Sequence, residues 1–148
     1  MKRTLFAIGL AAALAACATP IGGVSTPSDA ARIPSAPIDL GDWRNSDEAT
    51  TLSAFQEVVA ARYIAGLAID AVAADLTHNE FDCGPAPPPD AGRGEPPAQV
   101  CRRTITNGGC THTWQVHLFD ENNSGQLAHT RGLYDRSCGR DGLLGGPS

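Results

Sequence analysis

The stretch from residue 100 to residue 119 reads VCRRTITNGGCTHTWQVHLF, and it predicts two β-strands joined by a tight turn. Residues 100–106 are rich in β-branched side chains, which favour strands. The NGG sequence at 107–109 is typical of a hairpin turn, because glycine accepts the positive φ angles that such turns need. Residues 110–119 alternate between apolar and polar side chains. The alternation places four side chains on one face: His112, Trp114, Val116 and Leu118.

The turn also fixes the register of this hairpin. A two-residue turn at the glycines pairs Asn107 with Cys110, which places Cys101 opposite Val116. Cys101 then shares the face of Trp114, as an apolar core requires. Cys101 lies several residues from Cys110 along the ladder, whereas bridgeable cysteines have Cα atoms within about 7 Å. The register therefore excludes a disulfide between Cys101 and Cys110.

The sequence on either side predicts two more strands. Residues 80–83 form a short one, with Phe81 and Cys83 on one face, and residues 126–134 form the last one after the polar turn DENNSG at 120–125. Residues 84–98 contain six prolines and three glycines, so they are expected to form a long surface loop.

Upstream, the spacing of apolar residues predicts a helix over residues 47–76. Ser46 is the expected N-cap, and the helix would be about 45 Å long if unbroken. Gly66 lies within the helical stripe, where it indicates either a close approach to another element or a kink. The stripe recurs at steps of three and four residues: Leu52, Phe55, Val59, Arg62, Gly66, Ile69, Ala73 and Leu76. The predicted fold is α+β, with one long N-terminal helix packed on a four-stranded antiparallel β-meander.

Residues 1–17 have the three parts of an export signal. A basic start (Lys2 and Arg3) is followed by an apolar run and then by the sequence LAAC, which ends at Cys17. This pattern resembles the lipobox of bacterial lipoproteins. The resemblance implies cleavage before Cys17, which becomes the N-terminus and carries lipid that holds the protein on the membrane. A transmembrane helix is the alternative, but the run is well short of the ~20 residues that a span needs. Ala18, in place of Asp, implies the outer membrane rather than retention in the inner membrane, with the protein facing the periplasm.

These features predict three segments. Residues 1–16 are the signal peptide, and residues 17–40 are a lipidated, disordered tether containing Pro20, Pro27, Pro34 and Pro37. Residues 41–148 form the small α+β domain.

Four cysteines remain besides Cys17, and an even number in an exported chain predicts two disulfides. Their spacings of 18, 9 and 28 residues are unlike those of zinc sites. Three connectivities are possible. The hairpin geometry favours Cys83–Cys101, which closes the proline-rich loop, and Cys110–Cys138, which joins the ends of the last two strands.

Composition and spacing argue against several functions. Without residues 1–16 the chain has nine arginines and sixteen acidic residues, a formal charge of −7 that disfavours nucleic acid as a partner. We expect no metal and no cofactor. His117 faces His129 across the ladder if Phe119 pairs with Leu127, but a third ligand is lacking. Asp135, Ser137 and a histidine show no catalytic spacing, so we expect no catalytic residues and no enzyme.

The arginines near the sheet are a candidate interface. Arginine and tyrosine are enriched at the centres of protein interfaces, although solvated strand faces explain the same pattern. The candidate residues are Arg102, Arg103, Arg131, Tyr134 and Arg136.

Three functional hypotheses follow. The first is a non-catalytic, lipid-anchored envelope protein with an accessory or binding role toward an envelope partner, for which a peptidoglycan binder should show a polar groove on its sheet. The second is a small inhibitor of a lysozyme or protease that presents residues 84–98. The third is an envelope enzyme, which should cluster acids or histidines in a pocket.

Overall fold

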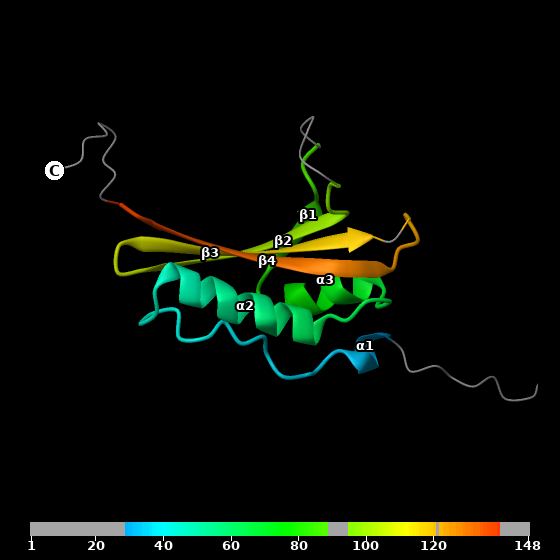
Figure 1. Ribbon diagram of the computed structural model, residues 1–148, viewed down its shortest axis with the longest axis horizontal. Coiled ribbons are helices and arrows are strands. Elements are labelled where there is room, and N and C mark those ends of the chain that lie inside the picture. The colour runs from blue at the N-terminus through cyan, green and yellow to red at the C-terminus, as the bar shows by residue number, and fades with distance from the viewer. Residues whose placement is uncertain (1–28, 89–94, 121, 140–148) are drawn as a thin grey trace, which may run out of the picture.

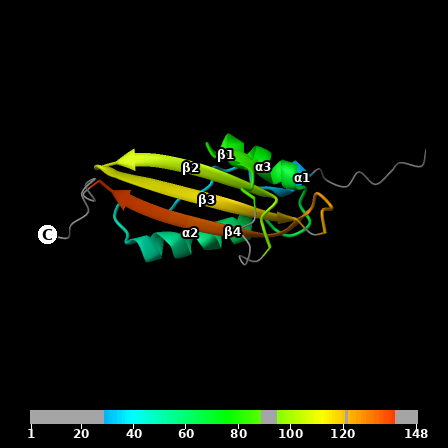
Figure 2. The same ribbon diagram turned by 90° about the horizontal axis from the view of Figure 1, so that it is seen from above.

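The computed structural model describes residues 29–88, 95–120 and 122–139, which form a sheet with helices on one face (Figure 1). The strands are antiparallel and follow one another in chain order. Seen from above, α2 runs beside β4 and α3 lies near β1 (Figure 2). The elements are α1 (Asp29–Arg32), α2 (Glu48–Arg62), α3 (Ile69–His78), β1 (Asp82–Pro85), β2 (Gln99–Asn107), β3 (Cys110–Asp120) and β4 (Leu127–Cys138).

The β2–β3 hairpin confirms the predicted register. Asn107 pairs with Cys110, and Cys101 pairs with Val116. Both turn glycines have positive φ angles, as the two-residue turn requires. The side chains of Trp114, Val116 and Leu118 are fully buried in the core that the sheet shares with the helices. The alternation along β3 therefore points one face into the core and leaves the other, the outer face, on the opposite side of the sheet.

The prediction of one long helix is wrong, because α2 ends at Arg62 and α3 begins at Ile69. Gly66 lies between them with φ +83°. Its N–H donates to the Leu127 carbonyl at 2.8 Å, and the Leu127 N–H donates to the Leu67 carbonyl at 2.8 Å. The interruption is thus held by backbone hydrogen bonds to the start of β4. Gly66 lies in the connection of residues 63–68 between two separate helices, so the structure has a break here rather than a kink.

The N-cap of α2 is Asp47 rather than the expected Ser46. The Asp47 carboxylate accepts a hydrogen bond from the Thr50 N–H at 2.7 Å. This bond lowers the pKa of Asp47 below its usual value, because it favours the charged form.

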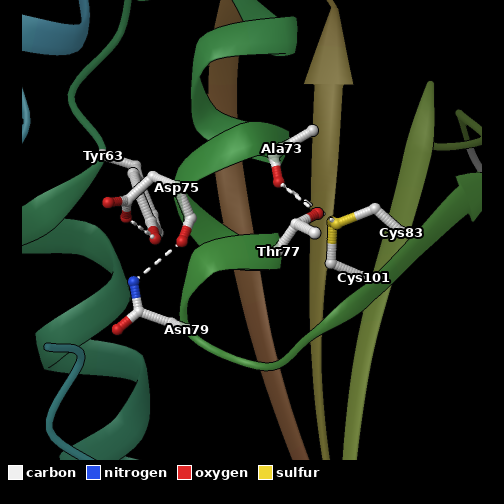
Figure 3. Close-up of a disulfide and its surroundings, with 7 residues drawn as sticks. All are labelled: Tyr63, Ala73, Asp75, Thr77, Asn79, Cys83 and Cys101. Atoms are coloured by element: carbon white, nitrogen blue, oxygen red, sulfur yellow. Dashed lines mark hydrogen bonds between the residues drawn. A yellow bond between two sulfur atoms is a disulfide. The ribbon is translucent and has the colours of Figure 1, made fainter.

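Both predicted disulfides are present. Cys83–Cys101 joins β1 to β2, with 4.0 Å between the Cα atoms, and Cys110–Cys138 joins β3 to β4, with 3.9 Å. Each bond links residues that are directly opposite in the ladder. Figure 3 shows the first bond beside α3, where the Cys83 sulfur lies 3.6 Å from the Ala73 carbonyl oxygen. This disulfide thereby packs the sheet against the helix layer.

The packed part of the chain begins before residue 41, the expected domain boundary. Ile33 and Ile38 are buried in the core. The buried Arg62 guanidinium donates to the carbonyls of Pro34 and Ala36, each at 2.8 Å, and pairs with Asp75 at 2.8 Å. Residues 29–40, predicted as part of a disordered tether, are therefore held on the helix layer. Residues 17–28 of that segment, and the signal peptide, lie outside the described residues.

Candidate functional site

A pocket of about 330 Å³ lies on the outer face of the sheet, away from the helices. Its walls combine the flanks of the β1–β2 connection, which stand above this face in Figure 1, with side chains of β2, β3 and β4. The apolar lining consists of Pro87, Pro88, Pro96, Pro97, Val100 and Phe119. The polar lining consists of Glu95, Arg102, Gln115, His117 and Arg131.

Phe119 gives this face a small apolar centre of its own. Its side chain is only 3% exposed although it points away from the main core. The His129 ring stacks on it with 4.3 Å between centroids, and the Arg131 guanidinium lies 5.2 Å from the ring centroid. The Phe119 ring is therefore almost completely covered, and the exposed Arg131 guanidinium above it is the group that is available to the anionic part of a ligand.

The polar groups of the pocket converge on Gln115. Its Oε1 atom lies 3.4 Å from the Arg102 Nη2 and 3.4 Å from the His117 Nε2. Arg131 is opposite His117 in the β3–β4 register. Side chains from three strands are therefore brought together by the sheet rather than by a loop, so their backbone positions are fixed by the ladder.

The electrostatics of the pocket favour a neutral histidine beside two cations. Burial, followed by the charges of Arg131 and Arg102, lowers the pKa of His117 below its usual value. A neutral His117 can donate or accept a hydrogen bond, while the two arginines supply the positive charge. Glu95 adds one carboxylate to the lining.

The five predicted interface residues do not form one surface in the structure: two line the pocket on the outer face, and three lie on the helix side of the sheet. Arg102 and Arg131 line the pocket together. Arg103 points toward the helix side, where it pairs with Glu80 and donates to the Asn79 carbonyl at 3.2 Å.

The other two residues of that prediction also lie on the helix side. Tyr134 is 7% exposed, and its hydroxyl oxygen lies 2.6 Å from the His112 Nδ1. Arg136 is exposed and pairs with His112 in the ladder. The prediction grouped residues from both faces of the sheet, because it did not assign the strand alternation to each arginine.

The conditional pairing of His117 with His129 is wrong. Phe119 pairs with His129, and a bulge between Phe119 and Asp120 shifts the register, so that Asp120 pairs with Leu127. Among the described residues, no group of three or more His, Cys, Asp or Glu side chains could hold a metal ion.

Three pocket residues were not predicted as site residues from the sequence: Val100, Gln115 and Phe119. Glu95 and the prolines of the lining lie in residues 84–98, which were predicted only as a loop that an inhibitor could present. Gln115 and Phe119 alternate with Trp114, so strand periodicity places them on the outer face. Nothing in the sequence indicated that the prolines after residue 95 would cover that face.

Two other hollows lie on the described part of the surface. One, of about 460 Å³, adjoins the pocket and is lined by polar turn residues, including Asp120. The Asp120 carboxylate already accepts hydrogen bonds from Ser124 and Gly125 within its own turn. The other, of about 320 Å³, is lined by Arg103 and Glu80, which pair with each other. Neither combines arginines with an aromatic ring as the outer-face pocket does.

Residues 1–18 match the family described as "Prokaryotic membrane lipoprotein lipid attachment site". This match confirms the lipobox and the lipid anchor at Cys17 that the sequence predicted. No curated protein and no solved structure matches the chain. Within the described residues, no helix has the length and hydrophobicity needed to cross a membrane.

Proposed function

We propose that this chain is a non-catalytic, lipid-anchored envelope protein that binds another envelope component through the outer-face pocket. The single observation that supports the proposal most is the arrangement of Arg102, Gln115, His117 and Arg131 around Phe119 on one sheet face. Concave sites with an apolar lining and a few convergent polar groups are the usual form of ligand sites.

The position of the anchor is compatible with this role. Cys17 and Asp29 are twelve positions apart, and a chain of that length reaches at most ~40 Å. The described chain enters through α1, on the helix side of the sheet (Figure 1). The segment from the lipid anchor thus joins the domain on its helix side, and the outer face of the sheet is available to partners. We place the protein on the periplasmic side of the outer membrane, because Ala18 follows Cys17.

Crosslinking in native envelopes tests the proposal. A photoreactive amino acid replaces Thr104, which is exposed on the outer face two residues from Arg102. The control carries it at Ala61, which is exposed on α2. We expect a specific adduct from position 104 and none from position 61. Adducts from position 61 alone would refute the proposal, because the helix side would then be the binding surface.

A further inference from the structure

We propose that the outer-face pocket binds the free carboxylate at the end of a short peptide. This inference rests on the proposed function and adds the chemistry of the ligand. It is carried by the two guanidinium groups, the apolar walls, the single acid in the lining and the size of the pocket.

The two arginines provide the carboxylate site. Arg102 contacts a neutral amide oxygen, that of Gln115, and the Arg131 guanidinium lies over the Phe119 ring. Guanidinium groups bind carboxylates through two parallel hydrogen bonds, which gives both strength and orientation. Arg102 and Arg131 lie on β2 and β4, the two neighbours of β3, so the pocket can be approached by an anion from between them.

Glu95 in the pocket lining favours the binding of a singly charged anion over that of a doubly charged one. Its carboxylate in the same lining repels any anion, and it repels a doubly charged phosphate more than a singly charged carboxylate. The negative charge of the chain without its signal peptide has the same effect. A ligand that presents one negative charge together with N–H donors satisfies both the arginines and Glu95, and the end of a peptide has this combination.

The remaining walls fit the peptide rather than an isolated ion. Val100 and the prolines provide apolar contact for a side chain, and Gln115 can hydrogen-bond a peptide group. The volume of about 330 Å³ is at the small end of ligand sites, which suits two or three residues. The pocket therefore matches a chain terminus in size, charge and polarity.

Titration calorimetry of the mature lipidated chain in detergent micelles tests this inference. The probe is acetyl-Ala-Ala with a free carboxylate, and its C-terminal amide is the matched control ligand. We expect the acid to bind at least ten times more tightly than the amide. The all-L and all-D forms of the acid are compared, because proteins end in L residues, whereas cell-wall peptides contain D residues. A preference for either form supports the inference and identifies the source.

Two variants locate the binding. Arg102→Gln combined with Arg131→Gln should abolish binding of the acid. Arg44→Gln combined with Arg136→Gln removes the same charge from exposed residues on the helix side and should leave binding unchanged. Thermal melting of both variants establishes that they are folded.

Three results would overturn the inference: equal binding of acid and amide, no binding of either, or equally tight binding of inorganic phosphate. If crosslinks from position 104 still form in envelopes, the proposed function stands and only the ligand chemistry is wrong. If those crosslinks are absent as well, both fail.

Discussion

Gly132 lies on β4, next to Phe55 and Gln56 of α2. A Cβ atom there would lie 3.2 Å from the Phe55 Cδ1 and 3.4 Å from the Gln56 Cα. The Gln56 side chain also donates to the Gly132 carbonyl at 3.1 Å. The close approach between helix and sheet, which was one of the two expectations for Gly66, is therefore made at Gly132, while Gly66 lies in the break between α2 and α3.

Gly132→Val should destabilise the protein by about 1–3 kcal/mol, because the added methyl groups overpack against a helix backbone that cannot move aside. Chemical denaturation measures this loss. Gly84→Val is the matched control, since a Cβ at Gly84 meets no atom within 4 Å. Equal unfolding free energies for the two variants would show that α2 and β4 have room for a larger side chain at position 132, which a Cβ only 3.2 Å from Phe55 Cδ1 excludes.

The two histidines of β3 predict a pH dependence of stability. Burial is the main cause that lowers the pKa values of His112 and His117 below 6.5, followed by the charges of nearby arginines. The unfolded chain then binds more protons than the folded one as the pH falls through 6.5. The contribution of the two neutral histidines to the free energy of unfolding should therefore be fully present above pH 7. It should be lost progressively as the pH falls toward 5.

Melting curves between pH 5 and pH 8 measure this effect. The double variant His112→Gln/His117→Gln should show a smaller decrease toward pH 5 than the original protein. An unchanged slope in that variant would assign the pH dependence to other groups.

At the scale of the elements, the two disulfides connect strands that differ in how many ladder pairs hold them without the disulfide. In the described part of the chain, β1 has four residues and pairs with one strand, β2, whereas β3 and β4 pair along eleven positions. Cys101 is fully buried, and its partner packs on α3. The Cys83–Cys101 bond therefore stabilises a part of the fold that has few other contacts.

Replacing Cys83 and Cys101 by alanine should cost roughly 2–4 kcal/mol of unfolding free energy. Replacing Cys110 and Cys138 should cost less, because their strands remain paired. Denaturation of both variants gives the comparison, and peptide mapping without reduction checks the connectivity. A Cys101–Cys110 peptide would contradict the hairpin register.

The elements show which parts of the fold are readable from sequence. The β2–β3 hairpin was predictable because the turn glycines and the alternation act locally. The end of α2 was not, because Ile69 and Leu76 continue the helical spacing across it. That break is held by two hydrogen bonds with Leu127 at the start of β4, one donated by the Gly66 N–H and one accepted by the Leu67 carbonyl, and Leu127 is about sixty positions away in the sequence.

The site was readable only in part. Arg102 and Arg131 were identified as interface candidates, but the hairpin alone could not indicate that both lie on one face with Phe119. That face is defined by the register of β4, which depends on a bulge.

For the whole molecule, Arg62 links the N-terminal segment to the helices, because it pairs with Asp75 and also donates to the carbonyls of Pro34 and Ala36. Tyr63 also donates to Asp75 at 2.7 Å, and Asn79 accepts from the Ile38 N–H at 2.7 Å. Burial, with the hydrogen bond to Asp75, raises the pKa of Tyr63, so its hydroxyl stays protonated. The segment that leads to the anchor is thus held by buried polar contacts as well as by Ile33.

Arg62→Met should remove this attachment. Asp75 would lose its charge partner in a mostly buried site, and the expected cost is about 3–5 kcal/mol. Hydrogen exchange should increase most at residues 33–38. Uniform exchange across that segment and the sheet would show that the segment and the domain unfold together. Arg136→Gln, an exposed substitution, is the control.

The central claim is that the anchored protein works through the outer face of its sheet. Crosslinking from position 104 in native envelopes tests it most directly when repeated in two charge variants. The adduct should disappear in Arg102→Gln/Arg131→Gln and persist in Arg44→Gln/Arg136→Gln, although both lose two positive charges. An adduct of equal yield in the two variants would contradict the claim, because the arginines of the pocket would then have no part in binding.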